Sequence, residues 1–310
     1  MDRPAVARSR EIASLLVIGA LVASTLSPAV ILSAGPEPRV TTADASARPA
    51  AADSNVAVAA AHLPAGPISS TPPTTVPRKA VDRPHPVVTD EDTSGCDPAP
   101  ATLKPAKVVS HGSRDQKVVA LTFDDGWDPG NTMKILGILQ HLHVNATFFP
   151  VGRAVQLFPS VWRAVADGGF PIADHSYDHP HLKGMCFAAQ LTELTRPQAI
   201  IRSVLGIEPF AVMRPPYGSW DANTKLAARA AGDSRVVLWD IDTRDWSGSG
   251  QWRIYRAAMA GQGGSIVLMH TFVKASAFAL PAIIAGYRAR GFTFVTIGQM
   301  LGLGGPVPYP

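Results

Sequence analysis

Residues 118–126 read Val-Val-Ala-Leu-Thr-Phe-Asp-Asp-Gly, an apolar run that ends in two adjacent carboxylates. The apolar part, residues 118–123, predicts a buried β-strand. Two neighbouring carboxylates repel each other and raise the pKa of one of them, unless a cation lies beside them. Asp and Gly are also common turn residues, so Asp124–Gly126 taken alone equally predicts a solvated turn.

From about residue 110 onward, short β-rich runs alternate with helical patterns. Besides 118–123, strands are expected at residues 146–151, 171–173, 210–213, 236–241, 265–269 and 294–297. Helices are expected at residues 131–141, 157–167, 187–205 (kinked at Pro197), 222–231, 252–260 and 280–290. This alternation predicts an α/β fold of parallel strands joined by helical crossovers. About seven such units indicate a distorted (β/α) barrel rather than an open sheet.

The N-terminal third has a different composition. The chain has 22 aromatic residues (6 Trp, 5 Tyr and 11 Phe), and all of them lie from Phe123 onward, which argues against a packed core before that point. Basic residues precede an apolar run, so residues 1–35 are expected to be a signal peptide or membrane anchor that places the rest outside the cytoplasm. Residues 36–105 hold 13 of the 28 prolines and predict a disordered linker. The folded domain is therefore expected at residues 106–305.

Charge and cysteine content limit the classes of partner. The net charge of +4 is spread without a Lys/Arg block, which argues against nucleic acid and suits an acidic polymer or an anionic envelope. Cys96 and Cys186 do not form a Cys-x-x-Cys pair, so a cysteine zinc site is not expected. The sequence leaves open whether they form one disulfide or remain two unpaired thiols.

Reactive residues follow the third expected strand, and the C-terminal ends of strands are where functional residues gather in a parallel barrel. Residues 174–180 read Asp-His-Ser-Tyr-Asp-His-Pro. One helical turn or a tight loop would place His175 and His179 on the same side. Two histidines and a carboxylate are a common ligand set for catalytic zinc, with a position left for water or substrate. The alternative is a pair of surface histidines.

Three later strands also end in polar residues. Residues 214–218 read Arg-Pro-Pro-Tyr-Gly, where the arginine can pair with a carboxylate or the prolines can simply form a turn. Residues 240–246 read Asp-Ile-Asp-Thr-Arg-Asp-Trp, which predicts a polar slot with one apolar wall, or a helix N-cap cluster. Residues 268–270 read Leu-Met-His, and a histidine there can act as a general acid or base, or be structural.

Taken in order, these segments resemble the five motifs of the polysaccharide deacetylases of the NodB-homology type, carbohydrate esterase family 4. The motifs T-F-D-D-G, H-S-x-x-H, R-x-P-Y, D-x-x-D-W and L-x-H stand here as Thr122–Gly126, His175–His179, Arg214–Tyr217, Asp242–Trp246 and Leu268–His270. The resemblance covers residues 118–300 and makes residues 106–305 the catalytic domain. It implies a distorted (β/α) barrel with fewer than eight units, in agreement with the strand count.

The resemblance also implies a role for each residue. Asp124 would be the general base, which Arg214 would orient and tune. Asp125, His175 and His179 would bind one divalent metal ion, with zinc favoured and cobalt or manganese as substitutes. Asp245 would tune His270 as the general acid, and the N–H of Tyr217 would stabilise the oxyanion. The residues expected to contact the acetylated sugar are Pro216, Tyr217, Trp246 and Leu268.

The expected activity is hydrolysis of acetyl groups from N-acetylglucosamine units of an extracellular polysaccharide, with peptidoglycan as the first choice. Deacetylation of chito-oligosaccharides or of acetyl xylan fits the same motifs, and a non-catalytic glycan-binding protein is a third interpretation. The protein is expected to be a secreted or envelope-anchored monomer that contacts a membrane only through its N-terminal segment. Thr271 and residues 272–279 depart from the usual family pattern at the pocket rim, which leaves substrate length and preference open.

Overall fold

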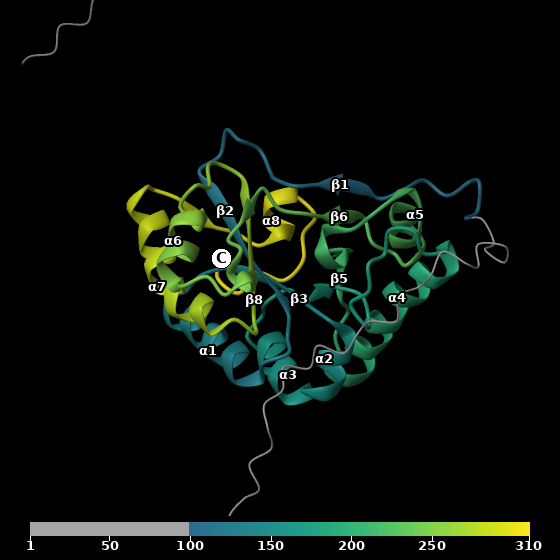
Figure 1. Cartoon of the computed structure of the whole chain (residues 1–310), viewed down its shortest axis with the longest axis horizontal. Coiled ribbons are helices and arrows are strands. Elements are labelled where there is room, and N and C mark those ends of the chain that lie inside the picture. Colours follow the sequence, from purple (N-terminus) through teal and green to yellow (C-terminus); the bar gives the residue numbers. More distant parts are fainter. Residues whose placement is uncertain (1–98) are drawn as a thin grey trace, which may run out of the picture. The chain divides into compact units, whose positions relative to one another are not determined.

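The computed structural model describes residues 99–310 (Figure 1). The expected signal peptide or anchor, nearly all of the expected linker, and Cys96 lie outside the described residues. Cys186 is disulfide-bonded, which excludes the alternative of two unpaired thiols. No helix among residues 99–310 is long and apolar enough to cross a membrane.

The named strands pair in parallel and form two sheets. The first has the order β3 (Ala146–Pro150), β2 (Val118–Asp125), β8 (Ser265–His270) and β7 (Ile241–Asp242), with β9 (Thr293–Phe294) also paired to β2. The second has the order β1 (Lys107–Val109), β6 (Arg235–Val237), β5 (Phe210–Met213) and β4 (Ala173–Asp174). A parallel bridge between Phe148 and Ile172 connects β3 to the segment that enters β4. The predicted α/β fold with a distorted, incomplete barrel is confirmed.

Helices cover the outside of the strands. They are α1 (Pro129–His141), α2 (Gly152–Leu157), α3 (Pro159–Asp167), α4 (Phe187–Ile200), α5 (Ala222–Ala230), α6 (Gln251–Ala258), α7 (Lys274–Ala289) and α8 (Ile297–Leu301). A π-helical turn (Ile201–Leu205) continues α4, and 3₁₀ turns occupy Pro216–Gly218 and Asp245–Ser247. Figure 1 shows α1, α6 and α7 on the side of β2 and β8, and α4 and α5 on the side of β5 and β6.

The central strand β2 fixes the position of the site. Seven of its eight residues are buried, as expected for a parallel strand covered on both faces. In the largest core cluster, the ring of Phe148 packs against Phe123, with centroids 5.4 Å apart, and edge-on against Trp162 at 6.1 Å. Because β3 and β8 hydrogen-bond to its two edges, the C-terminal end of β2 is a rigid platform.

Two expected elements differ in the structure. The helix expected at residues 157–167 is α3, in which Pro159 takes the first helical position, and the short helix α2 before it was not predicted. The strand expected at residues 236–241 is β6 in one sheet and β7 in the other. The division occurs at Asp240, whose carboxylate accepts the N–H of Ile266 at 2.7 Å and the hydroxyl of Ser265 at 2.9 Å. These bonds direct the chain toward β8.

Two further expectations need correction. The helix expected from residue 280 begins six residues earlier, at Lys274, and Pro281 lies inside it. The final strand ends at Phe294, because Thr296 instead caps α8 through a capping box with Gln299. The helix expected at residues 187–205 is confirmed as α4 and the π-helical turn that continues it, and Pro197 lies within α4.

Candidate active site

Register places two of the candidate residues side by side. In the ladder between β2 and β8, Asp124 lies opposite His270. Both residues stand at the C-terminal ends of their strands, and β3 contributes Phe149 on the other side of Asp124. The next residue, Asp125, takes a left-handed backbone conformation with a φ of 78°. This turn brings the second carboxylate to the same end of the strands as the first.

Arg214 follows β5 and crosses the interior of the domain to reach Asp124. Its Nη1 donates to Oδ1 of Asp124 and to Oγ1 of Thr122, both at 2.8 Å. Its Nε and Nη2 donate to the carbonyl oxygens of Val237 and Leu238. The side chain is fully buried, and such a charge is tolerated only when it is paired and hydrogen-bonded. The predicted contact between Arg214 and Asp124 is therefore present.

Asp125, His175 and His179 form one cluster whose ligand atoms all lie within 4.8 Å of one another. Oδ1 of Asp125 is 3.4 Å from Nε2 of His175 and 3.2 Å from Nε2 of His179. Two ligands about 2.0–2.1 Å from a tetrahedral zinc ion stand about 3.4 Å apart, so the spacing fits an ion of this kind. Among the described residues, this buried oxygen has no hydrogen-bond donor, as expected of an atom that holds a metal.

Protonation states in the cluster also fit a metal. Nδ1 of His175 lies 2.8 Å from the carbonyl oxygen of Arg214, and because a carbonyl only accepts, Nδ1 carries the proton and leaves Nε2 as a ligand. Burial lowers the pKa of His179 and favours its neutral form. Burial opposes the ionisation of Asp125, but the two imidazoles hold its pKa well below the usual range.

His270 is held by a second carboxylate. Nδ1 and the backbone N–H of His270 lie 2.7 and 2.8 Å from the two oxygens of Asp245. The same carboxylate accepts the N–H of Trp246 at 2.9 Å and the hydroxyl of Ser276 at 2.5 Å. Burial opposes protonation of His270, but Asp245 outweighs it and raises the pKa of His270 to about 9. The imidazole is thus a proton donor at neutral pH.

The residues expected to contact substrate differ in exposure. Tyr217 has a positive φ of 59°, and its backbone N–H donates to no described residue. Its half-exposed ring lies edge-on to His179 with centroids 4.6 Å apart. Trp246 is 56% exposed. Leu268 and Pro216 are buried, so they can form only an inner wall.

Comparison with known proteins places the chain in a family. The polysaccharide deacetylase family model matches residues 111–236. A peptidoglycan-N-acetylglucosamine deacetylase of Bacillus cereus is 32% identical over 194 residues, which are 61% of this chain and 70% of the relative. The chain belongs to the polysaccharide deacetylase family. The peptidoglycan-N-acetylmuramic acid deacetylase PdaC of Bacillus subtilis is 35% identical over 60% of this chain, which spans only 39% of the length of PdaC.

Solved structures agree with this family. A mutant of BA3943 of Bacillus anthracis, a carbohydrate esterase family 4 pseudoenzyme with restored enzymatic activity, matches with a TM-score of 0.61 and 28% identity. The match covers 65% of this chain and 73% of that one. Because pseudoenzymes share this fold, family membership alone does not establish catalysis, and the site itself has to carry that argument.

Backbone strain marks the deacetylase motifs. Six described residues other than glycine have a positive φ, and five of them are Asp125, Ser176, His179, Tyr217 and Arg244. Such conformations are costly outside glycine and concentrate at functional sites. Residues 175–179 form a tight loop rather than a helical turn, with the rings of His175 and His179 5.0 Å apart.

Sequence reasoning missed two residues that support the deacetylase motifs. Oε2 of Glu193, in α4, accepts the N–H groups of Tyr177 and Asp178 at 3.0 Å and so holds the loop between the two histidines. Ser276, in the first turn of α7, is buried and donates to Asp245. Neither lies in a motif, and each acts on a residue at least 15 positions away. A single sequence carries no signal for such contacts.

Proposed function

We propose that the protein hydrolyses acetyl groups from N-acetylglucosamine units of an extracellular polysaccharide, and that residues 106–305 are its catalytic domain. The observation that carries the proposal is that three groups of side chains lie together at the C-terminal ends of the strands. They are the arginine-held Asp124, the three-ligand cluster, and the imidazole of His270 held by Asp245. Together they supply a base, a metal site and an acid, which are the groups that metal-assisted hydrolysis of an amide uses.

Asp125, His175 and His179 would hold one divalent ion, with zinc favoured by two imidazoles and one carboxylate. When bound, the ion would polarise the acetyl carbonyl and make a nearby water more acidic. Asp124 would take the proton of that water as the water attacks. The ion pair with Arg214 keeps Asp124 oriented. The buried Oδ2 of Asp124 lies 3.8 Å from Nε2 of His175 and so faces the three candidate metal ligands.

His270 would complete the reaction by protonating the leaving nitrogen. Without a proton, the sugar nitrogen would have to leave as an unstable amide anion. The raised pKa of His270 keeps its imidazole protonated and so able to supply that proton. The N–H of Tyr217 would donate to the oxygen that gains negative charge. Trp246 would form the outer wall around the acetyl group, with Leu268 and Pro216 behind it.

Peptidoglycan is the proposed polymer. Two of the relatives named above are peptidoglycan deacetylases, and the basic and apolar pattern at the N-terminus predicts export to the envelope. The protein would act there as a secreted or anchored monomer. Chito-oligosaccharides and acetyl xylan are the second choice. Chito-oligosaccharides carry the same N-acetyl group, and the alkoxide released from an O-acetyl group of xylan leaves more easily than an amide anion, so the same residues would serve.

Acetate release by the full chain, supplied with zinc, tests the proposal. Peptidoglycan, chito-oligosaccharides and acetylated xylan would be compared with Asp125→Ala and with Asp178→Ala as a matched control. Asp178 lies in the histidine loop but pairs with Arg153 at the surface, so its removal should change little. Release that disappears only in Asp125→Ala supports the proposal. Bound zinc without release from any polymer would overturn it in favour of glycan binding.

A further inference from the structure

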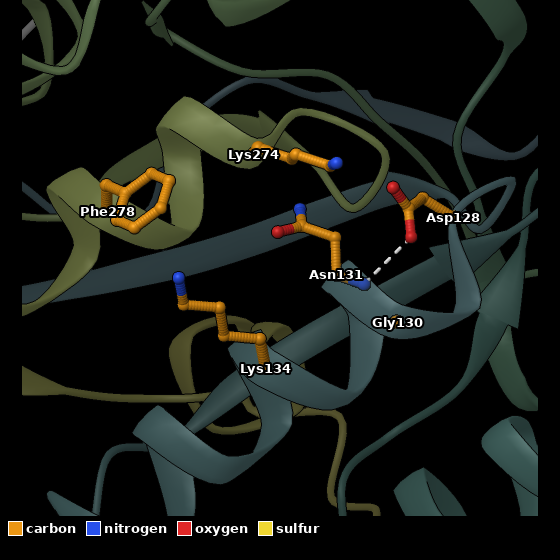
Figure 2. A pocket seen from close by; sticks show the side chains of 6 residues that line it. All are labelled: Asp128, Gly130, Asn131, Lys134, Lys274 and Phe278. Carbon is orange, nitrogen blue, oxygen red and sulfur yellow. Dashed lines mark hydrogen bonds between the residues drawn. The ribbon is translucent and has the colours of Figure 1, made fainter.

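We propose that a cavity next to the candidate active site binds a carboxylate carried by the polysaccharide, and thereby favours acidic over neutral glycans. The inference rests on the proposed function, because it concerns the same substrate. The cavity has a volume of about 390 Å³. Figure 2 shows the residues that line it, which are Asp128, Gly130, Asn131, Lys134, Lys274 and Phe278.

Chain connections place this cavity beside the reaction centre. Helix α1 follows β2, and Asp128 comes three residues after Asp125. Helix α7 follows β8, and Lys274 comes four residues after His270. Since β2 and β8 are neighbours, the two helices start next to each other at the edge where the catalytic residues lie. A polymer whose acetyl group is at the reaction centre can therefore extend over the cavity.

The cavity is rigidly built where the two helices meet. Nδ2 of Asn131, which is buried, donates to the carbonyl oxygens of Thr271 at 2.7 Å and Val273 at 3.0 Å. These bonds tie the first turn of α1 to the segment between His270 and α7.

Positive charge exceeds negative charge in the lining of the cavity. Among the described residues, Lys274 forms no ion pair or hydrogen bond, and the ammonium of Lys134 only lies 3.5 Å above the ring of Phe278. The single carboxylate of the lining belongs to Asp128, and its Oδ1 accepts the N–H of Asn131 as the cap of α1. The start of α7 has no side-chain cap, which adds partial positive charge. The lining thus carries two ammonium groups and one carboxylate, which leaves one positive charge in excess.

A carboxylate attached to a sugar fits this lining. It can pair with the two lysines while the sugar ring lies against Phe278, which is 58% exposed. Chitin and acetylated xylan backbones are neutral. Peptidoglycan carries a lactyl group on every second sugar, either as a free carboxylate or extended by a peptide with its own carboxylates. The cavity would therefore distinguish peptidoglycan from the neutral polymers.

The double variant Lys134→Gln/Lys274→Gln of the full chain tests the inference. Its kcat/KM would be measured on a neutral chito-oligosaccharide, on a peptide-free glycan of equal length with lactyl carboxylates, and on the same glycan with peptides. The ratio of acidic to neutral kcat/KM should fall about five-fold through a higher KM, as the loss of two exposed charge pairs suggests. The two acidic substrates show whether the lactyl group or the peptide supplies the carboxylate.

Lys117→Gln provides the matched control. It removes one positive charge, against two in the double variant, at the opposite end of β2, where Lys117 donates to the carbonyl oxygen of Arg290, and it should leave all ratios unchanged. Higher salt should lower the ratio in the wild type but not in the double variant. An unchanged ratio in a double variant that melts like the wild type would overturn the inference. If the wild type releases acetate from none of the three glycans, it is the proposed function that fails.

Discussion

The two halves of the candidate site treat a buried carboxylate in opposite ways. On the metal side, Oδ1 of Asp125 has no hydrogen-bond donor among the described residues and faces two imidazole nitrogens. On the acid side, the oxygens of Asp245 accept from two backbone N–H groups, one imidazole and one hydroxyl. A carboxylate left without donors is suited to hold a cation, whereas one with every lone pair used is suited to tune a neighbour. The fold thus separates metal binding from proton donation.

Asp124 lies between the two halves, and its substitution should have the largest effect. We expect Asp124→Asn to lower kcat by about 10³-fold, since general base catalysis contributes about 10²–10⁴-fold. Zinc content should stay at the wild-type level, because the ligands are untouched. Acetate release and metal analysis of the same preparation check both. An active Asp124→Asn variant would show that another group takes the proton.

Breaking the acid side should change the pH profile. In Asp245→Asn the pKa of His270 should fall from about 9, because the carboxylate that favours the imidazolium is lost. Since the protonated form is the acid, activity is lost as the pH rises through this pKa, and the alkaline limb of kcat should move to lower pH. The limb of Ser276→Thr should stay in place, because a hydroxyl is retained. An unmoved limb in Asp245→Asn would contradict the role of His270.

A substitution that weakens the support of the metal ligands, without changing a ligand itself, should lower zinc affinity and leave the pH profile unchanged. Glu193→Gln weakens the two bonds that hold the backbone between His175 and His179. We expect zinc affinity to fall about ten-fold, as for other residues that support metal ligands, with an unchanged alkaline limb. Competition with a chelator measures the affinity. Glu208→Gln, whose carboxylate pairs with Arg202 at the surface, is the matched control. Equal affinities would assign Glu193 a purely structural role.

The sequence predicted those parts of the molecule that depend on local pattern. Residues 210–213 form β5 as expected, and β2 begins at Val118 as expected, because a buried parallel strand is a continuous apolar run. The five motifs lie at strand ends, where strand–helix alternation placed them. The break between β6 and β7 depends on bonds from Asp240 to β8, and the contacts of Glu193 and Ser276 depend on helix packing. These tertiary contacts leave no periodic signal in a sequence.

A third buried carboxylate, that of Asp233, extends the comparison. It neither faces imidazole ligands, as Asp125 does, nor has all its lone pairs used by donors, as Asp245 does. Asp233 is 1% exposed and lies outside the candidate metal site, and its one side-chain hydrogen bond within residues 99–310 comes from Nε2 of Gln198 at 3.2 Å. Burial raises its pKa to about 8. With one neutral donor and no cation close enough to outweigh burial, this side chain is protonated at neutral pH. Donor number and neighbouring charge thus distinguish three buried carboxylates of one domain.

This assignment predicts how stability depends on pH. The pKa of Asp233 is about 8 in the folded protein and about 3.9 in the unfolded chain. Between these values the folded state keeps a proton that the unfolded state has released, so the free energy of unfolding falls as the pH rises, by about 1 kcal/mol per pH unit. Asp233→Asn imitates the protonated acid and should flatten this slope, which urea unfolding at pH 5, 6 and 7 would measure. Parallel slopes in the variant and the wild type would mean that Asp233 is ionised in the folded protein, and that burial with a single neutral donor does not keep a carboxylate neutral here.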